Sequence, residues 1–161
     1  MSRSNSRNKY FTVNQFKETP RFSSILMSGL NKQIVSSFAN REELLKLLKV
    51  NPGLVVIKLG ATWCGPCKTI KHVVDAFFAS SPPNVICADI DVDESFDLYA
   101  YLKSKRVTNG IPALLMYKKG NVSFMPDLIH TGSDPSGLDN FFKQCGHHLA
   151  AVERAYGMQK L

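Results

Sequence analysis

The chain has 161 residues, of which 44% are hydrophobic and 20% charged, and its formal net charge is +7. This length accommodates one domain with a full hydrophobic core, and the composition is typical of a globular protein. No apolar run approaches the roughly 20 residues of a membrane-spanning helix, and four cysteines are too few for a disulfide scaffold. We therefore expect a one-domain globular protein without a membrane span.

The excess positive charge is concentrated at the N-terminus, where residues 1–21 contain five basic side chains and one acidic side chain. A basic stripe can bind nucleic acid or an anionic membrane, but no basic run continues into the periodic segments that follow. We therefore predict that residues 1–33 form a basic extension that is solvated or docks on a partner, and we do not expect nucleic-acid binding. The extension also resembles a mitochondrial presequence, because it is rich in Arg and Ser and nearly free of acid.

From residue 34 onward, strand and helix patterns alternate. The predicted strands cover about residues 34–38, 54–61, 84–92, 111–117 and 122–131, and the predicted helices about residues 40–50, 64–80, 93–105 and 135–158. Gly146 interrupts the last helical pattern, so we place a break there. This break divides the rest of the chain into a main domain, residues 34–145, and a C-terminal helical extension, residues 146–161.

This order of elements predicts the fold class. Helices between successive strands require right-handed crossovers and parallel pairing, whereas the last two strands form an antiparallel hairpin. The expected architecture is an α/β fold with a mixed five-stranded sheet flanked by helices on both faces.

Cys64 and Cys67 stand two residues apart where a buried strand gives way to a helix. A helix N-terminus stabilises an anion, so the pKa of the Cys64 thiol should fall toward neutrality and favour the reactive thiolate. Cys67 lies one turn further and can resolve a mixed disulfide, while Gly65 and Pro66 suit a tight helix start. The alternative is half of a zinc site, but zinc needs more ligands at matched spacing. We predict a redox pair and no metal.

The sequences WCGPCK, residues 63–68, and GIPALLMYKKG, residues 110–120, closely resemble those of thioredoxins. The resemblance covers about residues 34–145 with the elements in the same order. It implies the thioredoxin fold, with Cys64 as the nucleophile and Cys67 as the resolving cysteine. It also implies that protein disulfides are the substrates, that no bound cofactor is needed, and that a thioredoxin reductase or a glutathione system supplies electrons.

The resemblance further implies a substrate-binding surface beside the cysteines. Its predicted members are Trp63, Gly65, Pro66, Ile111, Pro112 and Gly132. The Ile111–Pro112 bond is expected to be cis, which is uncommon and usually a deliberate turn feature. The backbone of Ile111 would then pair with an extended substrate segment, and Gly132 would open the other wall of the groove.

One departure from the family changes the charge near the cysteines. Thioredoxins typically bury an aspartate six residues before the first cysteine, and here that residue is Lys58. Asp89 lies at the same register of the neighbouring strand, where thioredoxins often carry lysine, so the two should form an inverted ion pair. We count both as candidate catalytic residues. The Lys58 charge could stabilise a thiolate and raise the reduction potential, its neutral amine could act as a base, or its side chain could reach the surface without a role.

Three milder departures concern packing. Gly60 replaces an aromatic residue of the family, so the packing beneath the site should be looser. His72 replaces a proline in the active-site helix, which should make that helix straighter, and we expect it on the helix surface. Pro126 falls within the last predicted strand and suggests a bulge or an edge excursion there.

The leading functional prediction is a cytoplasmic thiol–disulfide oxidoreductase that reduces or exchanges protein disulfides through Cys64 and Cys67. The alternative is a thioredoxin-fold binding or assembly module that docks on a larger complex through its basic extension, with the redox site secondary. A third interpretation is an oxidase or isomerase of an oxidising compartment. Mitochondrial targeting, or residence in a larger assembly, stays open as an alternative location.

Overall fold

The computed structural model describes residues 10–12 and 33–159. Its strands are β1 (Tyr10–Thr12), β2 (Ile34–Ser37), β3 (Leu54–Gly60), β4 (Val85–Asp91), β5 (Ala113–Lys118) and β6 (Leu128–Thr131). Its helices are α2 (Glu42–Lys49), α3 (Gly65–Ser80), α4 (Phe96–Ser104) and α5 (Pro135–Gln159). Most of the predicted basic extension lies outside the described residues, so its docking role stays a prediction.

A mixed sheet with the strand order β1-β2-β4-β3-β5-β6 forms the centre of the molecule. The first four strands are parallel, and β5 and β6 are each antiparallel to the preceding neighbour. The predicted five strands are confirmed as β2 to β6. The sheet nevertheless has a sixth strand, because β1 from the predicted extension pairs with β2 at the edge, with Tyr10 opposite Ile34.

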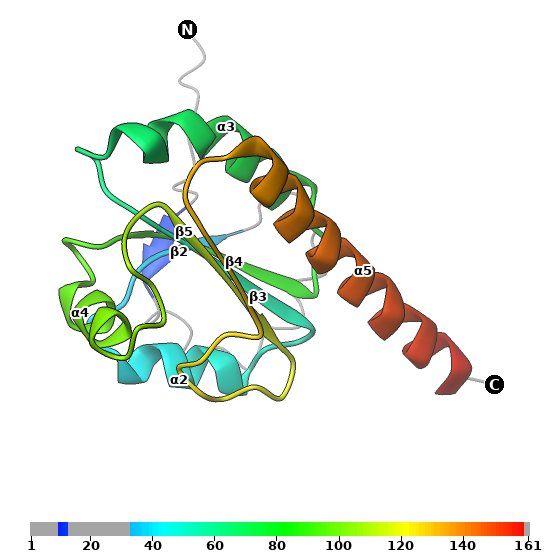
Figure 1. Cartoon of the computed structure of the whole chain (residues 1–161). Coiled ribbons are helices and arrows are strands. Elements are labelled where there is room, and N and C mark those ends of the chain that lie inside the picture. The colour runs from blue at the N-terminus through cyan, green and yellow to red at the C-terminus, as the bar shows by residue number, and fades with distance from the viewer. Residues whose placement is uncertain (1–9, 13–32, 160–161) are drawn as a thin grey trace, which may run out of the picture.

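Helices cover both faces of the sheet, with α2 and α4 on one face and α3 and α5 on the other (Figure 1). All seven residues of β3 are buried because the strand is central and covered on both sides. Successive side chains of a strand point to opposite faces. Val55 and Ile57 therefore pack beneath α2 and α4, whereas Val56 packs beneath α3 and α5. Lys58 and Gly60 follow Val56 on the α3 side.

The predicted last strand begins later than expected. β6 starts at Leu128, and residues 119–127 form a loop that contains Pro126, so the expected long strand with a bulge was wrong. Pro126 has no N–H to donate to a neighbouring strand. The Asp127 carboxylate instead accepts the Lys118 N–H at 2.8 Å, which fastens the loop to the end of β5.

The expected break at Gly146 was also wrong, because α5 continues through it. A glycine inside a helix costs about 1 kcal/mol relative to alanine. Cys145 and Leu149 on either side of it are buried against the sheet, and this packing outweighs the cost. The predicted boundary between the main domain and the C-terminal extension therefore falls inside a continuous helix.

Candidate active site

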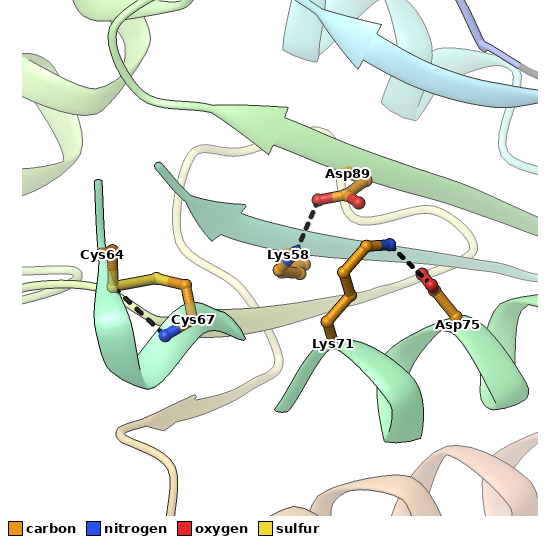
Figure 2. A network of polar contacts seen from close by, with 6 residues as sticks. All are labelled: Lys58, Cys64, Cys67, Lys71, Asp75 and Asp89. Atoms are coloured by element: carbon orange, nitrogen blue, oxygen red, sulfur yellow. Dashed lines mark hydrogen bonds and ion pairs between the residues drawn. A yellow bond between two sulfur atoms is a disulfide. The ribbon is translucent and has the colours of Figure 1, made fainter. Parts of the chain in front are cut away.

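The two cysteines form a disulfide at the start of α3 (Figure 2). Cys64 is the N-cap residue with an extended backbone, and its sulfur accepts the Cys67 N–H at 3.2 Å. Pro66 lies at the first turn, where a missing N–H has no cost, and Gly65 next to it is exposed. The Cys64 sulfur therefore occupies the position at which a helix N-terminus stabilises a negative charge.

Trp63 flanks the disulfide with 67% of its surface exposed. Its indole N–H donates to Asp93 Oδ2 at 2.8 Å, which fixes the orientation of the ring. Asp93 is not among the site residues predicted from the sequence. A usable signal was the register, because Gly60 pairs with Asp91 and the segments that follow β3 and β4 therefore leave the same edge of the sheet.

The Ile111–Pro112 bond is cis, as the resemblance implied. Gly132 donates its N–H to the Pro112 carbonyl at 2.9 Å, so it holds this bend from the neighbouring strand. Its φ of +113° lies in the region that only glycine adopts without strain. Ala113 pairs with Leu59 near the end of β3, so the proline bend lies at the sheet edge from which the cysteine segment departs.

Lys58 and Asp89 form the predicted ion pair, with Nζ 3.0 Å from Oδ1 (Figure 2). They face each other because β3 and β4 are parallel and place these two residues in register. Lys58 is 7% exposed, so the interpretation in which its side chain reaches the surface was wrong. A buried charge without a partner would be costly, and Asp89 relieves that cost.

Because Gly60 has no side chain, no side-chain atom of residue 60 separates the Lys58 side chain from the disulfide. A Cβ atom at Gly60 would lie 3.4 Å from Lys58 Cε and 3.5 Å from Cys67 Sγ. The two atoms therefore face the same small volume, and their separation cannot exceed the sum of these distances. This empty volume is the looser packing that the sequence predicts. It also places the Lys58 side chain beside the resolving cysteine.

The remaining residues of interest lie away from the disulfide. His72 is exposed on α3, as expected for a surface residue. Cys87 and Cys145 are buried, and Cys87 Sγ lies 3.4 Å from Ser81 Oγ. Burial raises the pKa of Cys145 to about 12, so its thiol stays protonated. Among residues 10–12 and 33–159, no three His, Cys, Asp or Glu side chains are grouped to hold a metal ion. Nor does any helix in these ranges combine the length and apolar character that crossing a membrane requires.

The geometry defines a class of protein, namely a thioredoxin-fold domain with a disulfide-forming cysteine pair at a helix N-terminus near a cis-proline. A family model described as Thioredoxin matches residues 34–144, which is more than half of the chain. The chain belongs to the thioredoxin family, and the resemblance identified from the sequence is confirmed.

Individual relatives agree with this assignment. The chain is 36% identical to thioredoxin of Bos taurus over 89 residues, which cover 55% of this chain and 77% of the relative. It is 28% identical to thioredoxin of Coprinus comatus over 113 residues, or 69% and 97% of the two chains. The solved thioredoxin of Trichomonas vaginalis is similar with a TM-score of 0.56 and 28% identity, over 69% of this chain and 96% of that chain. Family and cysteine pair together assign the protein to the thiol–disulfide oxidoreductases.

Proposed function

We propose that the protein reduces disulfide bonds of other proteins, with Cys64 as the attacking and Cys67 as the resolving cysteine. The position of the Cys64 sulfur carries this proposal, because it caps α3 and accepts the Cys67 N–H at 3.2 Å. Attack on a disulfide requires a thiolate, and the helix N-terminus favours that form.

The reaction proceeds in two exchanges that leave the electrons balanced. The Cys64 thiolate attacks one sulfur of the substrate, forms a mixed disulfide and expels the other sulfur as a thiolate. The Cys67 thiolate then attacks the Cys64 sulfur, releases the reduced substrate and forms the disulfide seen in the structure. A thioredoxin reductase or a glutathione system returns two electrons to this disulfide.

We propose that the substrate binds against Trp63, the Ile111–Pro112 bend and Gly132. In this proposal an extended substrate segment pairs with the backbone of Ile111, as a strand adds to a sheet edge. The indole bond to Asp93 and the Gly132 bond to Pro112 hold the two walls in place. Rigid walls reduce the entropy lost when the segment binds.

We further propose that Lys58 raises the reduction potential of the pair. Its side chain lies beside the Cys67 sulfur, and a nearby positive charge stabilises a thiolate more than a thiol. A stabilised thiolate favours the reduced protein. Asp89 at 3.0 Å offsets part of this charge. A neutral Lys58 that acts as a base is the competing interpretation.

Turbidimetric reduction of insulin, driven by dithiothreitol, tests the main proposal. Cys64→Ser should abolish the acceleration, and Cys67→Ser should accumulate a mixed disulfide with insulin on Cys64. Cys145→Ala is the matched control, because Cys145 is a buried free thiol in the helix that follows β6. Activity in Cys64→Ser equal to that of the wild type would contradict the assignment of the nucleophile.

A further inference from the structure

Phe96, the first residue of α4, is a strongly exposed aromatic side chain, with 69% of its surface accessible. Leu98 and Leu102 of the same helix are buried against the sheet, so the core contacts of α4 do not depend on Phe96. An exposed ring forgoes the stabilisation that burial provides. A partner that covers Phe96 would gain this free energy on binding.

Phe96 lies close to Trp63, the aromatic residue that flanks the disulfide. Asp93, three residues before Phe96, accepts the Trp63 indole N–H at 2.8 Å. Three residues span at most about 11 Å even in an extended chain. The Ser95 N–H donates to the Asp91 carbonyl at 3.1 Å, which folds this segment into a turn and shortens that distance. The Asp93 bond therefore keeps the two aromatic residues near each other.

Both rings present apolar surface to solvent. Trp63 is 67% exposed and Phe96 is 69% exposed, so neither ring serves to bury the other. The bond to Asp93 fixes the indole, and a fixed ring loses little entropy on binding. Exposed aromatic side chains that a partner can cover often dominate the energy of an interface. Because Trp63 belongs to the proposed substrate-binding surface, Phe96 extends that surface toward α4.

The carboxylates around these rings give the surface a negative charge, although the chain as a whole carries +7. Asp91, Asp93 and Glu94 form no ion pair with a basic side chain among residues 10–12 and 33–159. Asp93 and Glu94 are exposed. A basic group of a partner is attracted to such a surface, whereas an acidic group is repelled.

Nearby lysines do not cancel this charge. Three lysines line the groove between β3, β4 and α3 that also contains Asp91 and Glu94. Two of them are neutralised by their own carboxylate partners, in the pairs Lys58–Asp89 and Lys71–Asp75. The third, Lys68, offsets one of the three unpaired carboxylates, which leaves an excess of two.

We propose that Phe96 and Trp63 bind an apolar side chain next to the disulfide of a protein substrate. Asp93 and Glu94 select substrates that carry a basic residue beside that side chain. The occupant of this surface is therefore the stretch of substrate that flanks the cysteine attacked by Cys64. Phe96 takes no part in the thiol exchange and determines specificity through binding. This inference rests on the proposed function and names its class of substrate.

The first experiment determines the preferred sequence. The Cys67→Ser variant, which cannot resolve a mixed disulfide, is mixed with an excess of peptides that contain one cysteine between randomised flanking residues. Each peptide cysteine is linked by a disulfide to 2-nitro-5-thiobenzoate. Attack of the Cys64 thiolate on the peptide sulfur joins the peptide to Cys64 and expels the coloured aromatic thiolate. Dithiothreitol then releases the trapped peptides, and mass spectrometry sequences them.

We expect apolar and basic residues to be enriched together in the trapped peptides. In the Cys67→Ser background, Phe96→Ala should reduce the enrichment of apolar residues, and Glu94→Gln that of basic residues. Tyr156→Ala and Glu153→Gln are the matched controls, because both residues are exposed near the end of α5, far from the start of α3 (Figure 1). Unchanged apolar enrichment in Phe96→Ala would overturn the role of Phe96. Trapped peptides without a basic preference would overturn the charge assignment.

The second experiment measures the size of the effect. Phe96→Ala should slow trapping of an enriched peptide at least about fivefold, as expected for loss of an aromatic anchor. The disulfide of 2-mercaptoethanol with 2-nitro-5-thiobenzoate has the same leaving group but no flanking residues, so its rate should stay within about twofold. Equal slowing of both reagents would overturn the proposal, since it would show an effect on Cys64 itself. The fold should persist in Phe96→Ala because the side chain is exposed.

The proposed function and this inference fail in different ways. If no peptide is trapped on Cys64, the proposed attack of Cys64 on protein disulfides is rejected. If peptides are trapped on Cys64 without regard to their flanking residues, the function stands and the specificity inference is overturned. Added salt should reduce the basic preference and leave the apolar preference, because only the former is electrostatic.

Discussion

The reduction potential should depend on the sign of the charge at position 58. Lys58→Met alone would leave Asp89, which is largely buried, without its partner, and breaking such a pair is destabilising. Two double variants avoid this problem. Lys58→Met with Asp89→Asn removes both charges, and Lys58→Asp with Asp89→Lys restores the order of signs that thioredoxins typically have.

The magnitude follows from the positions of the two charges. The position that a Cβ atom at Gly60 would occupy lies 3.4 Å from Lys58 Cε and 3.5 Å from Cys67 Sγ. If the Lys58 ammonium and a Cys67 thiolate are about 6 Å apart, their attraction is about 2.8 kcal/mol at an effective dielectric constant of about 20. The Asp89 carboxylate, 3.0 Å from Lys58 Nζ, repels the thiolate and offsets part of this attraction. If it lies about 3 Å further from the sulfur, about 1 kcal/mol of thiolate stabilisation remains.

A thiolate stabilisation of about 1 kcal/mol corresponds to a shift of about 20 mV in the reduction potential of a two-electron couple. The charge-free double variant should therefore have a potential about 20 mV below the wild type, and the exchanged pair about 40 mV below it. Equilibration with glutathione buffers measures each potential. The differences should grow as the pH rises from 6 to 9, because the charge acts on the thiolate and not on the thiol.

Equal potentials for the three proteins would refute the electrostatic reasoning. Differences that do not change with pH would point instead to altered packing around the disulfide. If Lys58 acts as a neutral base, the potentials would agree, but the rate of resolution by Cys67 would fall in the charge-free variant. Thermal denaturation of each variant checks that the fold is retained.

Three other predictions concern the walls of the site and the buried thiol. Gly132→Ala, at a φ of +113°, should lower the free energy of unfolding by about 1–3 kcal/mol in urea denaturation, because the Pro112 bend depends on that backbone. Asp93→Ala should raise the KM for insulin about threefold by freeing the Trp63 ring, and change stability by less than about 0.5 kcal/mol, because the bond is exposed. Cys145, whose pKa is about 12, should resist iodoacetamide at a pH of about 9 until the protein is denatured, whereas early alkylation would show that its burial is transient.

Much of the site was predictable because it depends on local patterns. The Lys58–Asp89 pair follows from two buried strands whose residues alternate with period two, so one register brings both side chains to the same face. The helix start at Cys64 follows from the change of period and from the Gly-Pro pair. The cis bond at Pro112 came from resemblance, since no local rule selects the cis isomer.

The features that were missed depend on contacts between distant parts of the chain. β1 has three residues, which is too short for a periodic pattern, and it exists through pairing with β2. Glycine at 146 predicts a break by propensity, but burial of Cys145 and Leu149 holds the helix. Asp93 bonds to an indole 30 residues away in the sequence. Nonlocal partners decide each of these cases, so local propensity alone does not predict them, although the β3–β4 register pointed toward Asp93.

Two departures from the family, Lys58 and Gly60, lie on one side of the disulfide. Trp63, the Ile111–Pro112 bend and Gly132, which form the proposed protein-substrate groove, match the family. Lys58 and Gly60 depart from it, and both face the Cys67 sulfur. In the proposed function, the first group contacts the substrate that Cys64 attacks, whereas the second group lies beside the resolving cysteine, Cys67. These two differences should therefore appear in resolution and in electron supply, and not in the first attack on a protein disulfide.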